Sequence, residues 1–179
     1  MKIYNHIEVD NQQLISDKLY DYIVNHTEVF TDKMFWNDLN TNTVLEYVPE
    51  LSKVLHDMQL EPKDIAVIYA EPYMQGGVHV DDDPDVRLLW PVRNCLGSLT
   101  KFFHAEEKDR EKLSLPNGKI YIGISDPSKC EQIGEFELTT PVVFDPNIPH
   151  GIYTNMNCSE PRITVTIRLH NPPVHLLED

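Results

Sequence analysis

The chain has 179 residues, a formal net charge of −14 and 41% hydrophobic residues, values typical of one soluble globular domain. The acidic charge argues against nucleic acid as a partner, because phosphate binding requires clustered Lys and Arg. No run of about 18 apolar residues occurs, so no transmembrane helix is expected. The N-terminus lacks the apolar core of a signal peptide, which predicts a cytoplasmic protein. Three widely spaced cysteines indicate neither a disulfide framework nor a zinc knuckle.

Two amphipathic helices are expected in the first third of the chain. Apolar residues recur at helical spacing over residues 11–25 and again over 44–58, the period of a helix with one buried face. Pro49 interrupts the second pattern and suits the first turn of a helix. The polar segment 30–42 between the two patterns is expected to be irregular.

Short β-rich runs separated by turn residues follow from Asp64 onward. We expect strands at residues 65–73, 86–92, 98–104, 119–125, 134–139, 141–144, 151–155 and 162–169. Helices followed by many short strands predict a mainly β, α+β chain whose second part is a sandwich or barrel. The basic run Lys108 to Lys112 is interleaved with acidic residues and is interpreted as a solvated loop.

A His-x-Asp pair follows two glycines in the segment 76–83. If the segment is extended, His79 and Asp81 leave the same face of the strand and their side chains converge. That arrangement is half of a mononuclear metal site. Asp82 and Asp83 would replace Asp81 only after a shift of register, and we expect them in a solvated loop that faces the substrate.

His150 is the expected third ligand, because it follows a proline-bearing turn and opens a strand. If that strand and the strand 162–169 form a hairpin around Met156, His150 and Arg162 lie nearly opposite each other. A half-buried arginine needs an anionic partner, which a protein carboxylate or a bound ligand would supply. Arg168, on the same face as Arg162, is the second choice for that role.

Two imidazoles and one carboxylate are the ligand set typical of non-heme Fe(II) oxygenases. The order His79-Val80-Asp81, then His150, then Arg162-Ile163-Thr164 resembles the Fe(II)/2-oxoglutarate-dependent dioxygenase superfamily. It looks closest to the small prolyl-4-hydroxylase-like members, and the resemblance covers roughly residues 65–169.

The resemblance implies a double-stranded β-helix, that is, a cupin-like jelly roll, with the N-terminal helices packed on its outer face. One domain would then span residues 1–179. Its parts would be a helical support at 1–62, a β-helix core at 63–170 and a tail at 171–179. The tail begins at Asn171.

The same resemblance implies site residues. His79, Asp81 and His150 would bind Fe(II), while Arg162 with Thr164 would bind the C5 carboxylate of 2-oxoglutarate. Further contacts to the co-substrate are expected from neighbouring strands, and the candidates are Tyr69, Tyr73 and Asn94.

The implied reaction consumes O₂ and 2-oxoglutarate, releases succinate and CO₂, and hydroxylates a substrate. The resemblance also allows a role for ascorbate as a further cofactor. The substrate class implied is a free amino acid or a peptidyl side chain; the sequence does not identify the molecule, the pathway or the oligomeric state. Two alternatives stay open: a cupin-like divalent-metal enzyme that does not use 2-oxoglutarate, and an inactive jelly-roll binding module. The pairs His6/Glu8 and His104/Glu106 share the His-x-acid form but are expected to be fortuitous matches.

Overall fold

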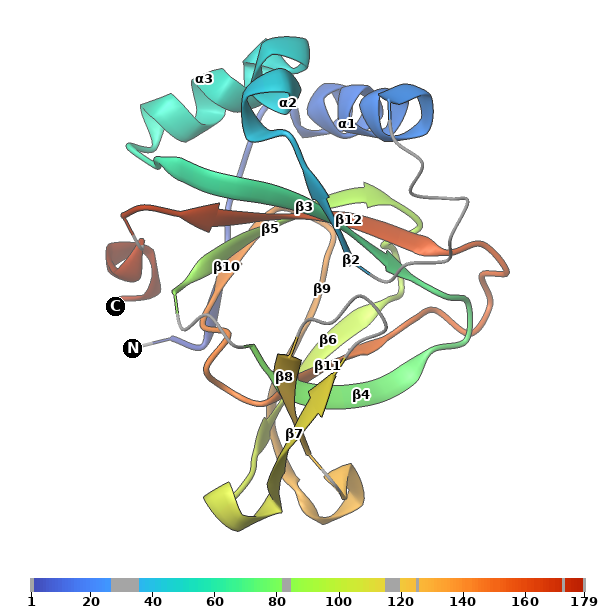
Figure 1. The fold of residues 1–179 in the computed structure, drawn as a ribbon. Coiled ribbons are helices and arrows are strands. Elements are labelled where there is room, and N and C mark those ends of the chain that lie inside the picture. The colour runs from blue at the N-terminus through green and yellow to red at the C-terminus, as the bar shows by residue number, and fades with distance from the viewer. Residues whose placement is uncertain are drawn as a thin grey trace.

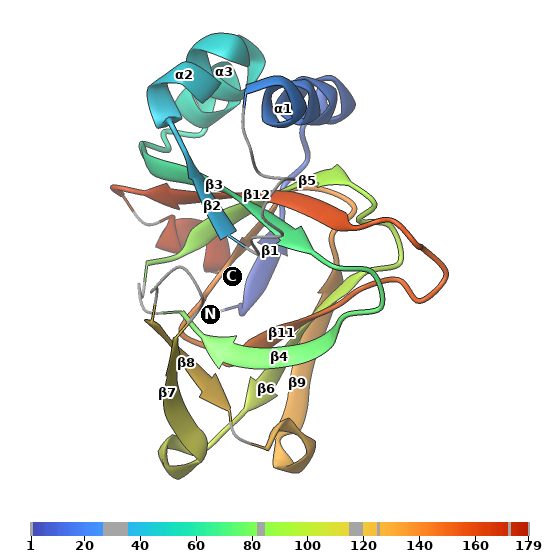
Figure 2. The same ribbon diagram turned by 45° about the vertical axis from the view of Figure 1, so that its right-hand side comes forward.

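The computed structural model describes residues 2–26, 36–81, 85–114, 120–124, 126–171 and 173–178. Over these residues two antiparallel six-stranded sheets face each other, and three helices cover the outer face of one of them (Figures 1 and 2). This is the mainly β jelly roll that the sequence predicts, with its helices on the outside. Within the described part of the chain, no helix is long and apolar enough to cross a membrane.

The first sheet has the strand order β1-β10-β5-β12-β3-β2. Its strands are β1 (Tyr4–His6), β10 (Val142–Phe144), β5 (Arg87–Arg93), β12 (Arg162–Leu169), β3 (Pro62–Ala70) and β2 (Trp36–Leu39). The second sheet has the order β7-β8-β4-β11-β6-β9. Its strands are β7 (Arg110–Ser114), β8 (Ile120–Ile124), β4 (Gln75–Val80), β11 (His150–Tyr153), β6 (Leu99–His104) and β9 (Glu131–Glu137).

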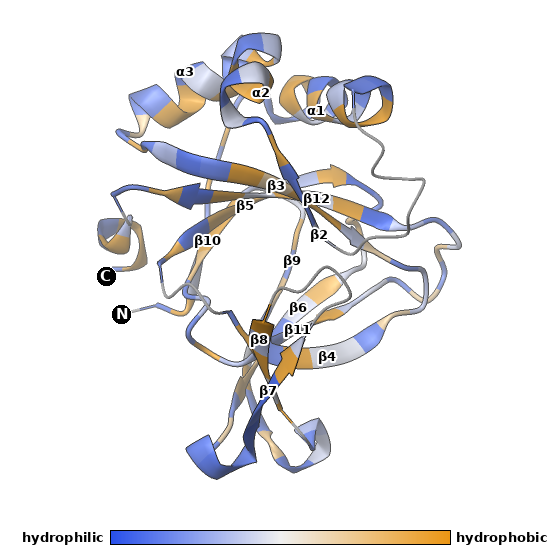
Figure 3. Cartoon of the chain, in the orientation of Figure 1, coloured by the Kyte–Doolittle hydropathy of each residue, from blue (hydrophilic) through white to orange (hydrophobic). Residues whose placement is uncertain are grey.

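The helices α1 (Gln12–His26), α2 (Thr41–Tyr47) and α3 (Pro49–Asp57) pack on the first sheet (Figure 1). Each carries hydrophobic and hydrophilic bands (Figure 3), as expected of helices that bury one face. Asn40 begins α2, where its side chain accepts a hydrogen bond from the Thr43 amide, and Pro49 occupies the first turn of α3. The shared core also includes alternate residues of β12, namely Ile163, Val165, Ile167 and Leu169.

Because successive strand residues point to opposite faces, the other β12 residues point between the sheets. These are Arg162, Thr164, Thr166 and Arg168, and all four line the cavity inside the barrel. A strictly alternating strand therefore supplies the hydrophobic core on one side and the floor of a polar cavity on the other.

The structure differs from the sequence-based expectations at several places. The segment expected to be irregular contains β2, while residues 27–35 lie outside the described part. The expected solvated loop at Lys108 forms a 3₁₀ turn, Glu107–Asp109, and then enters β7. The strand β1 was not expected, because three residues carry too little pattern to predict one. The expected tail contains a 3₁₀ turn, Val174–Leu177, whose Leu177 is buried.

The expected hairpin around Met156 is also wrong. β11 belongs to the second sheet and pairs with β4 and β6, whereas β12 belongs to the first sheet and pairs with β3 and β5. The chain crosses from one sheet to the other between β11 and β12, as it does between β3 and β4 and between β4 and β5. His150 and Arg162 therefore lie on facing sheets, where both line the cavity, and not on paired strands.

Candidate metal centre

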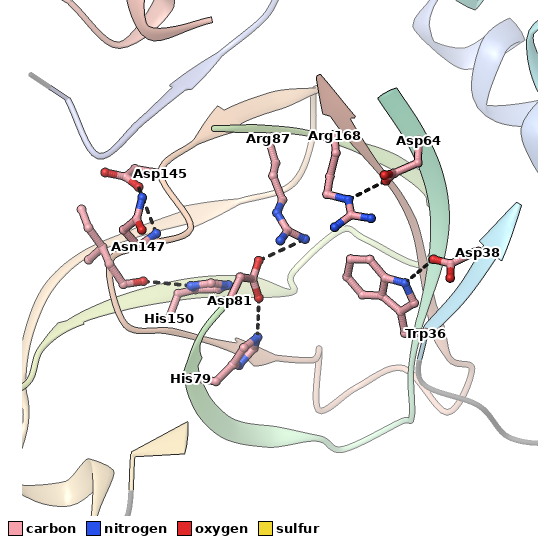
Figure 4. Close-up of polar contacts among 11 residues, drawn as sticks. Trp36, Asp38, Asp64, His79, Asp81, Arg87, Asp145, Asn147, His150 and Arg168 are labelled. Atoms are coloured by element: carbon pink, nitrogen blue, oxygen red, sulfur yellow. Dashed lines mark hydrogen bonds and ion pairs between the residues drawn. The ribbon is translucent and has the colours of Figure 1, made fainter. Parts of the chain in front are cut away.

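Three potential metal ligands converge at the centre of the barrel. His79 lies on β4, Asp81 directly follows that strand, and His150 opens β11. The strands β4 and β11 pair with His79 opposite His150, and one ligand atom from each of the three residues lies within 4.8 Å of the others. The sequence therefore predicted residues that the structure brings together (Figure 4).

Backbone carbonyls orient both imidazoles. The Nδ1 atom of His79 lies 2.7 Å from the Gly77 carbonyl oxygen, and Nδ1 of His150 lies 2.9 Å from that of Ile148. Since a carbonyl only accepts, each Nδ1 carries a hydrogen, which leaves Nε2 as the atom that can bind a metal. Such a contact behind the ring is the usual support of a metal-binding histidine. Although burial opposes it, the hydrogen bond to Asp81 raises the pKa of His79, so a bound metal would replace the proton on Nε2 of His79.

The third group, Asp81, is held at both carboxylate oxygens. Its Oδ1 lies 3.3 Å from Nε2 of His79, and its Oδ2 lies 3.2 Å from a terminal nitrogen of the buried Arg87. Burial alone would raise the pKa of the Asp81 carboxyl, but the His79 hydrogen bond and the nearby cationic side chains hold that pKa well below its usual range. Asp81 is therefore an anion in the folded protein.

Burial lowers the pKa of His150 to about 4, and the neighbouring His79 acts in the same direction. At neutral pH the His150 ring is therefore uncharged, which is the form that binds metals. The centre thus offers two imidazole nitrogens and one carboxylate oxygen, the set expected for a divalent transition metal with open coordination positions.

Arg162 is a buried cation on the opposite wall. Its side chain is 2% exposed, and Nε and both terminal nitrogens are buried without a hydrogen-bond partner among the described residues. Burial lowers its pKa, and the Cys95 thiol opposes that shift. Burial also raises the pKa of this thiol, so the thiol stays neutral at neutral pH. A buried guanidinium without a counter-ion is costly, which indicates a binding site for an anion.

The cavity that joins these groups has a volume of about 510 Å³. Thr164, the predicted companion of Arg162, lines it and is buried. Thr100 of β6 also lines it, and its hydroxyl is buried without a hydrogen-bond partner in the described structure. Thr100 was not predicted from the sequence, because its inward position on β6 depends on the register of strands that are distant in sequence.

Tyr69, Tyr73 and Asn94 do not belong to the cavity lining. Tyr69 is paired with Ile163 and packs with it in the core beneath the helices. Tyr73 is 53% exposed, and Asn94 is exposed in a turn where its side-chain amide donates to the Pro161 carbonyl. Residue type near the motif does not predict which side of a strand faces the cavity, and strand alternation places Tyr69 on the face that the helices cover.

The remaining His-x-acid pairs lie elsewhere. The His6 ring contacts the Thr140 hydroxyl, and His104 is exposed at the end of β6. Neither histidine lines the cavity. Asp82 and Asp83, the alternatives to Asp81, lie outside the described residues.

Comparison of the chain with known proteins gives matches among solved structures alone. No family model and no curated protein sequence matches it. Among solved structures, E. coli ycfD aligns at 15% identity with a TM-score of 0.39, over 75% of this chain and 32% of that one. AviO1 from Streptomyces viridochromogenes aligns at 13% identity with a TM-score of 0.48, over 96% and 91% of the two chains.

A viral collagen prolyl hydroxylase from Paramecium Bursaria Chlorella virus-1 aligns at 13% identity with a TM-score of 0.43, over 94% of this chain and 90% of that one. The chain spans about a third of the ycfD chain. At such low similarity, the function has to follow from the geometry of the site itself.

Proposed function

We propose that the chain is an Fe(II)- and 2-oxoglutarate-dependent oxygenase. One observation carries the proposal: a single cavity contains both the potential metal ligands His79, Asp81 and His150 and the buried Arg162, whose side-chain nitrogens have no hydrogen-bond partner among the described residues. A dicarboxylate that binds a metal at one end and a guanidinium at the other matches both features. The sequence order of the same residues supports the proposal independently.

The donor set fits iron(II). His79 and His150 would contribute Nε2, because their Nδ1 atoms are turned to carbonyls, and Asp81 would contribute Oδ1, because Oδ2 faces Arg87. Three protein ligands would leave coordination positions on the metal for 2-oxoglutarate and for O₂. When bound, iron(II) with 2-oxoglutarate and O₂ supplies the oxygen-transfer chemistry that side chains alone cannot perform.

The chain's own residues position and shield the reactants. Arg162 would bind the distal carboxylate of 2-oxoglutarate by donating a forked pair of hydrogen bonds to it, with the hydroxyls of Thr164 and Thr100 alongside. Leu89 and Phe144 line the same cavity, so apolar surface limits the access of water to the reacting atoms. The substrate class in the proposal is a small molecule or peptidyl side chain.

The first experiment measures co-substrate binding without turnover. Under anaerobic conditions, 2-oxoglutarate is titrated into the iron-loaded protein and the visible absorption is recorded. Wild type should develop a new band, whereas Arg162→Leu should require a concentration of 2-oxoglutarate at least about tenfold higher, since a lost charged hydrogen bond costs about 1.5–3 kcal/mol.

The second experiment measures succinate in air with iron and ascorbate. His79→Ala should abolish succinate formation, and the matched control His104→Ala should retain it, because His104 is exposed and distant from the cavity. Normal turnover by His79→Ala would refute the proposal. Stoichiometric metal binding without any response to 2-oxoglutarate would instead favour the cupin-like enzyme, and absence of metal binding would favour the inactive module.

A further inference from the structure

One wall of the cavity is apolar and lies beside the metal ligands. Tyr121 of β8 lines the cavity, and its ring meets that of His79 edge-on, with centroids 5.7 Å apart and an interplanar angle of 87°. Ile120, the preceding residue, also lines the cavity and is 55% exposed, so the cavity opens to solvent there. The start of β8 therefore leads from the cavity mouth to the metal centre.

The register of the second sheet explains why Tyr121 reaches His79. The strand β8 lies beside β4 (Figure 1), with Gly123 opposite His79. Tyr121 is two residues before Gly123 and points to the same face of β8. Since residue 123 has no side chain, the Tyr121 ring can contact the His79 ring diagonally across the two strands.

Leu113 of β7 belongs to the same wall. It is directly opposite Tyr121 in the pairing of β7 with β8, so the two side chains lie on one face. A methyl group of Leu113 occupies the space above Gly123, where an added Cβ would collide with it. Tyr121, Leu113 and Ile120 thus form an apolar surface next to the metal ligands, which we call the β7–β8 wall.

The apolar lining continues on the other side of β4. Ile152 of β11 is paired with Gly76 of β4 and lines the cavity, as does Met74, which precedes β4. The cavity volume of about 510 Å³ lies within the range of sites for drug-sized ligands, roughly 300–1,000 Å³, so the cavity has room for more than a five-carbon acid. A second ligand in this part of the cavity would contact apolar side chains on both sides of β4.

The charged groups elsewhere in the cavity do not favour a charged second ligand. Apart from Arg162, the arginines that line the cavity already have carboxylate partners. Arg87 contacts Asp81 at 3.2 Å, and Arg168 contacts Asp64 at 2.6 Å. A charged group beside the β7–β8 wall would lose its hydration without gaining a counter-ion, which is costly, whereas removal of an apolar group from water is favourable.

We infer that the β7–β8 wall contacts the primary substrate, with Tyr121 as the residue that determines specificity, and that the substrate group beside the triad is uncharged and apolar. The inference rests on the proposed function, because it assigns the space next to the triad to a molecule that is oxidised there. The substrate class it names comprises molecules with an aliphatic or aromatic group, which the Tyr121 ring contacts.

The test measures binding without turnover. Protein loaded with zinc and saturating 2-oxoglutarate is titrated with N-acetyl amino-acid amides, which share one uncharged backbone, and binding is followed by saturation-transfer NMR. The leucine, valine and phenylalanine derivatives carry apolar groups, whereas the aspartate and lysine derivatives carry charges. At least one apolar derivative should bind, and both charged derivatives should bind about tenfold or more weakly, since a buried charge without a counter-ion is costly. Equal binding of apolar and charged derivatives, or no binding of any apolar derivative, would overturn the inference.

Two variants of Tyr121 separate a ligand contact from support of the metal centre. Tyr121→Ala should weaken binding of the apolar derivative about fivefold or more, whereas Tyr121→Phe, which keeps the ring, should change it by less than about twofold. Zinc affinity of both variants should stay within about threefold of wild type, whereas loss of a group that supports a metal-binding histidine costs about tenfold or more. Equal losses of zinc and of the apolar derivative in Tyr121→Ala would make Tyr121 a structural support of His79 and refute the inference.

Tyr47→Ala is the matched control, because Tyr47 lies on α2, outside the cavity lining. It should bind the apolar derivative as wild type does, and a loss equal to that of Tyr121→Ala would refute the role of the wall. Circular dichroism of each variant checks that it is folded.

These measurements also distinguish the two proposals. If wild type does not bind 2-oxoglutarate but Tyr121→Ala loses the apolar derivative, the proposed function fails and the β7–β8 wall stands. If 2-oxoglutarate binds through Arg162 while Tyr121→Ala leaves binding of the apolar derivative unchanged, the wall fails and the proposed function stands.

Discussion

At the scale of single residues, the ion pair between Arg87 and Asp81 holds the metal centre together before any metal binds. Both side chains are almost fully buried, and removal of one partner from a buried pair costs about 3–5 kcal/mol. We expect Arg87→Leu to lower the free energy of unfolding of the metal-free protein by about 3 kcal/mol, measured by urea denaturation.

The exposed pair Lys53–Asp57 provides the control for that measurement. Its side chains are 74% and 55% exposed, and solvent screening leaves exposed pairs on one helix little effect on stability. Lys53→Ala should therefore leave the unfolding curve almost unchanged. A loss in Arg87→Leu no greater than that in Lys53→Ala would show that Asp81 does not depend on Arg87.

The cysteines give a second prediction at this scale. Burial raises the pKa of the Cys95 thiol, and only the thiolate reacts rapidly with disulfide reagents. Cys158 is partly exposed. In the folded protein at pH 8, an aromatic disulfide reagent should label Cys158 first and Cys95 only after unfolding, as peptide mass spectrometry can show. Early labelling of Cys95 would contradict its burial.

Some of these residues could be predicted from the sequence and others could not. His79, Asp81 and Arg162 lie in runs whose period-two alternation fixes which side chains share a face. Arg87 and Thr100 have no such signal, because their roles depend on which distant strand lies opposite. The buried Arg162 was expected to need an anion, and the structure adds that the protein supplies no hydrogen-bond partner within its described part.

At the scale of elements, the pairing of β4 with β11 determines the distance between the two imidazoles. At Gly151, an added Cβ would lie 3.0 Å from the Gly76 carbonyl oxygen and 3.2 Å from a Val78 methyl group. Because a backbone oxygen cannot rotate away, Gly151→Ala should push the strands apart and displace His150, its neighbour in the chain. We expect it to weaken metal affinity about tenfold or more, since a slight misplacement of ligands is costly, measured by isothermal titration with zinc.

Gly134 on β9 is the matched control. An added Cβ there would meet its nearest neighbour, a methyl group of Ile3, at 3.6 Å, an ordinary contact distance. Gly134→Ala should therefore retain wild-type metal affinity. Equal affinities for Gly151→Ala and wild type would show that the strand spacing tolerates the extra carbon.

The sequence predicted most strands but not their partners. Alternation and turn residues locate a strand such as β12, yet β11 and β12 are consecutive strands of different sheets, which sequence proximity cannot reveal. The hairpin interpretation failed because it assumed that consecutive strands pair. The resemblance to a jelly roll gave the correct arrangement, since it implies strands that alternate between two sheets.

At the scale of the whole molecule, a bound metal would connect parts of the chain that are far apart in sequence. His79 and Asp81 are about seventy residues from His150, and a ligand that binds only the folded state adds about 2.7 kcal/mol of stability at a free concentration of 100 times Kd. For a domain of this size, 1 kcal/mol corresponds to roughly 2–4 °C in Tm. We therefore expect zinc or iron(II) at that concentration to raise Tm by roughly 5–10 °C, and a chelator to reverse the increase.

His150→Ala should lose this metal-dependent increase, whereas His104→Ala should keep it, because His104 is exposed and outside the cavity. The comparison needs no turnover, so it tests the metal centre separately from 2-oxoglutarate and from the substrate. An equal increase in wild type and in His150→Ala would place the metal elsewhere on this acidic chain. A loss confined to His150→Ala would instead identify His150 as a metal ligand, as its position opposite His79 on the paired strands β4 and β11 predicts.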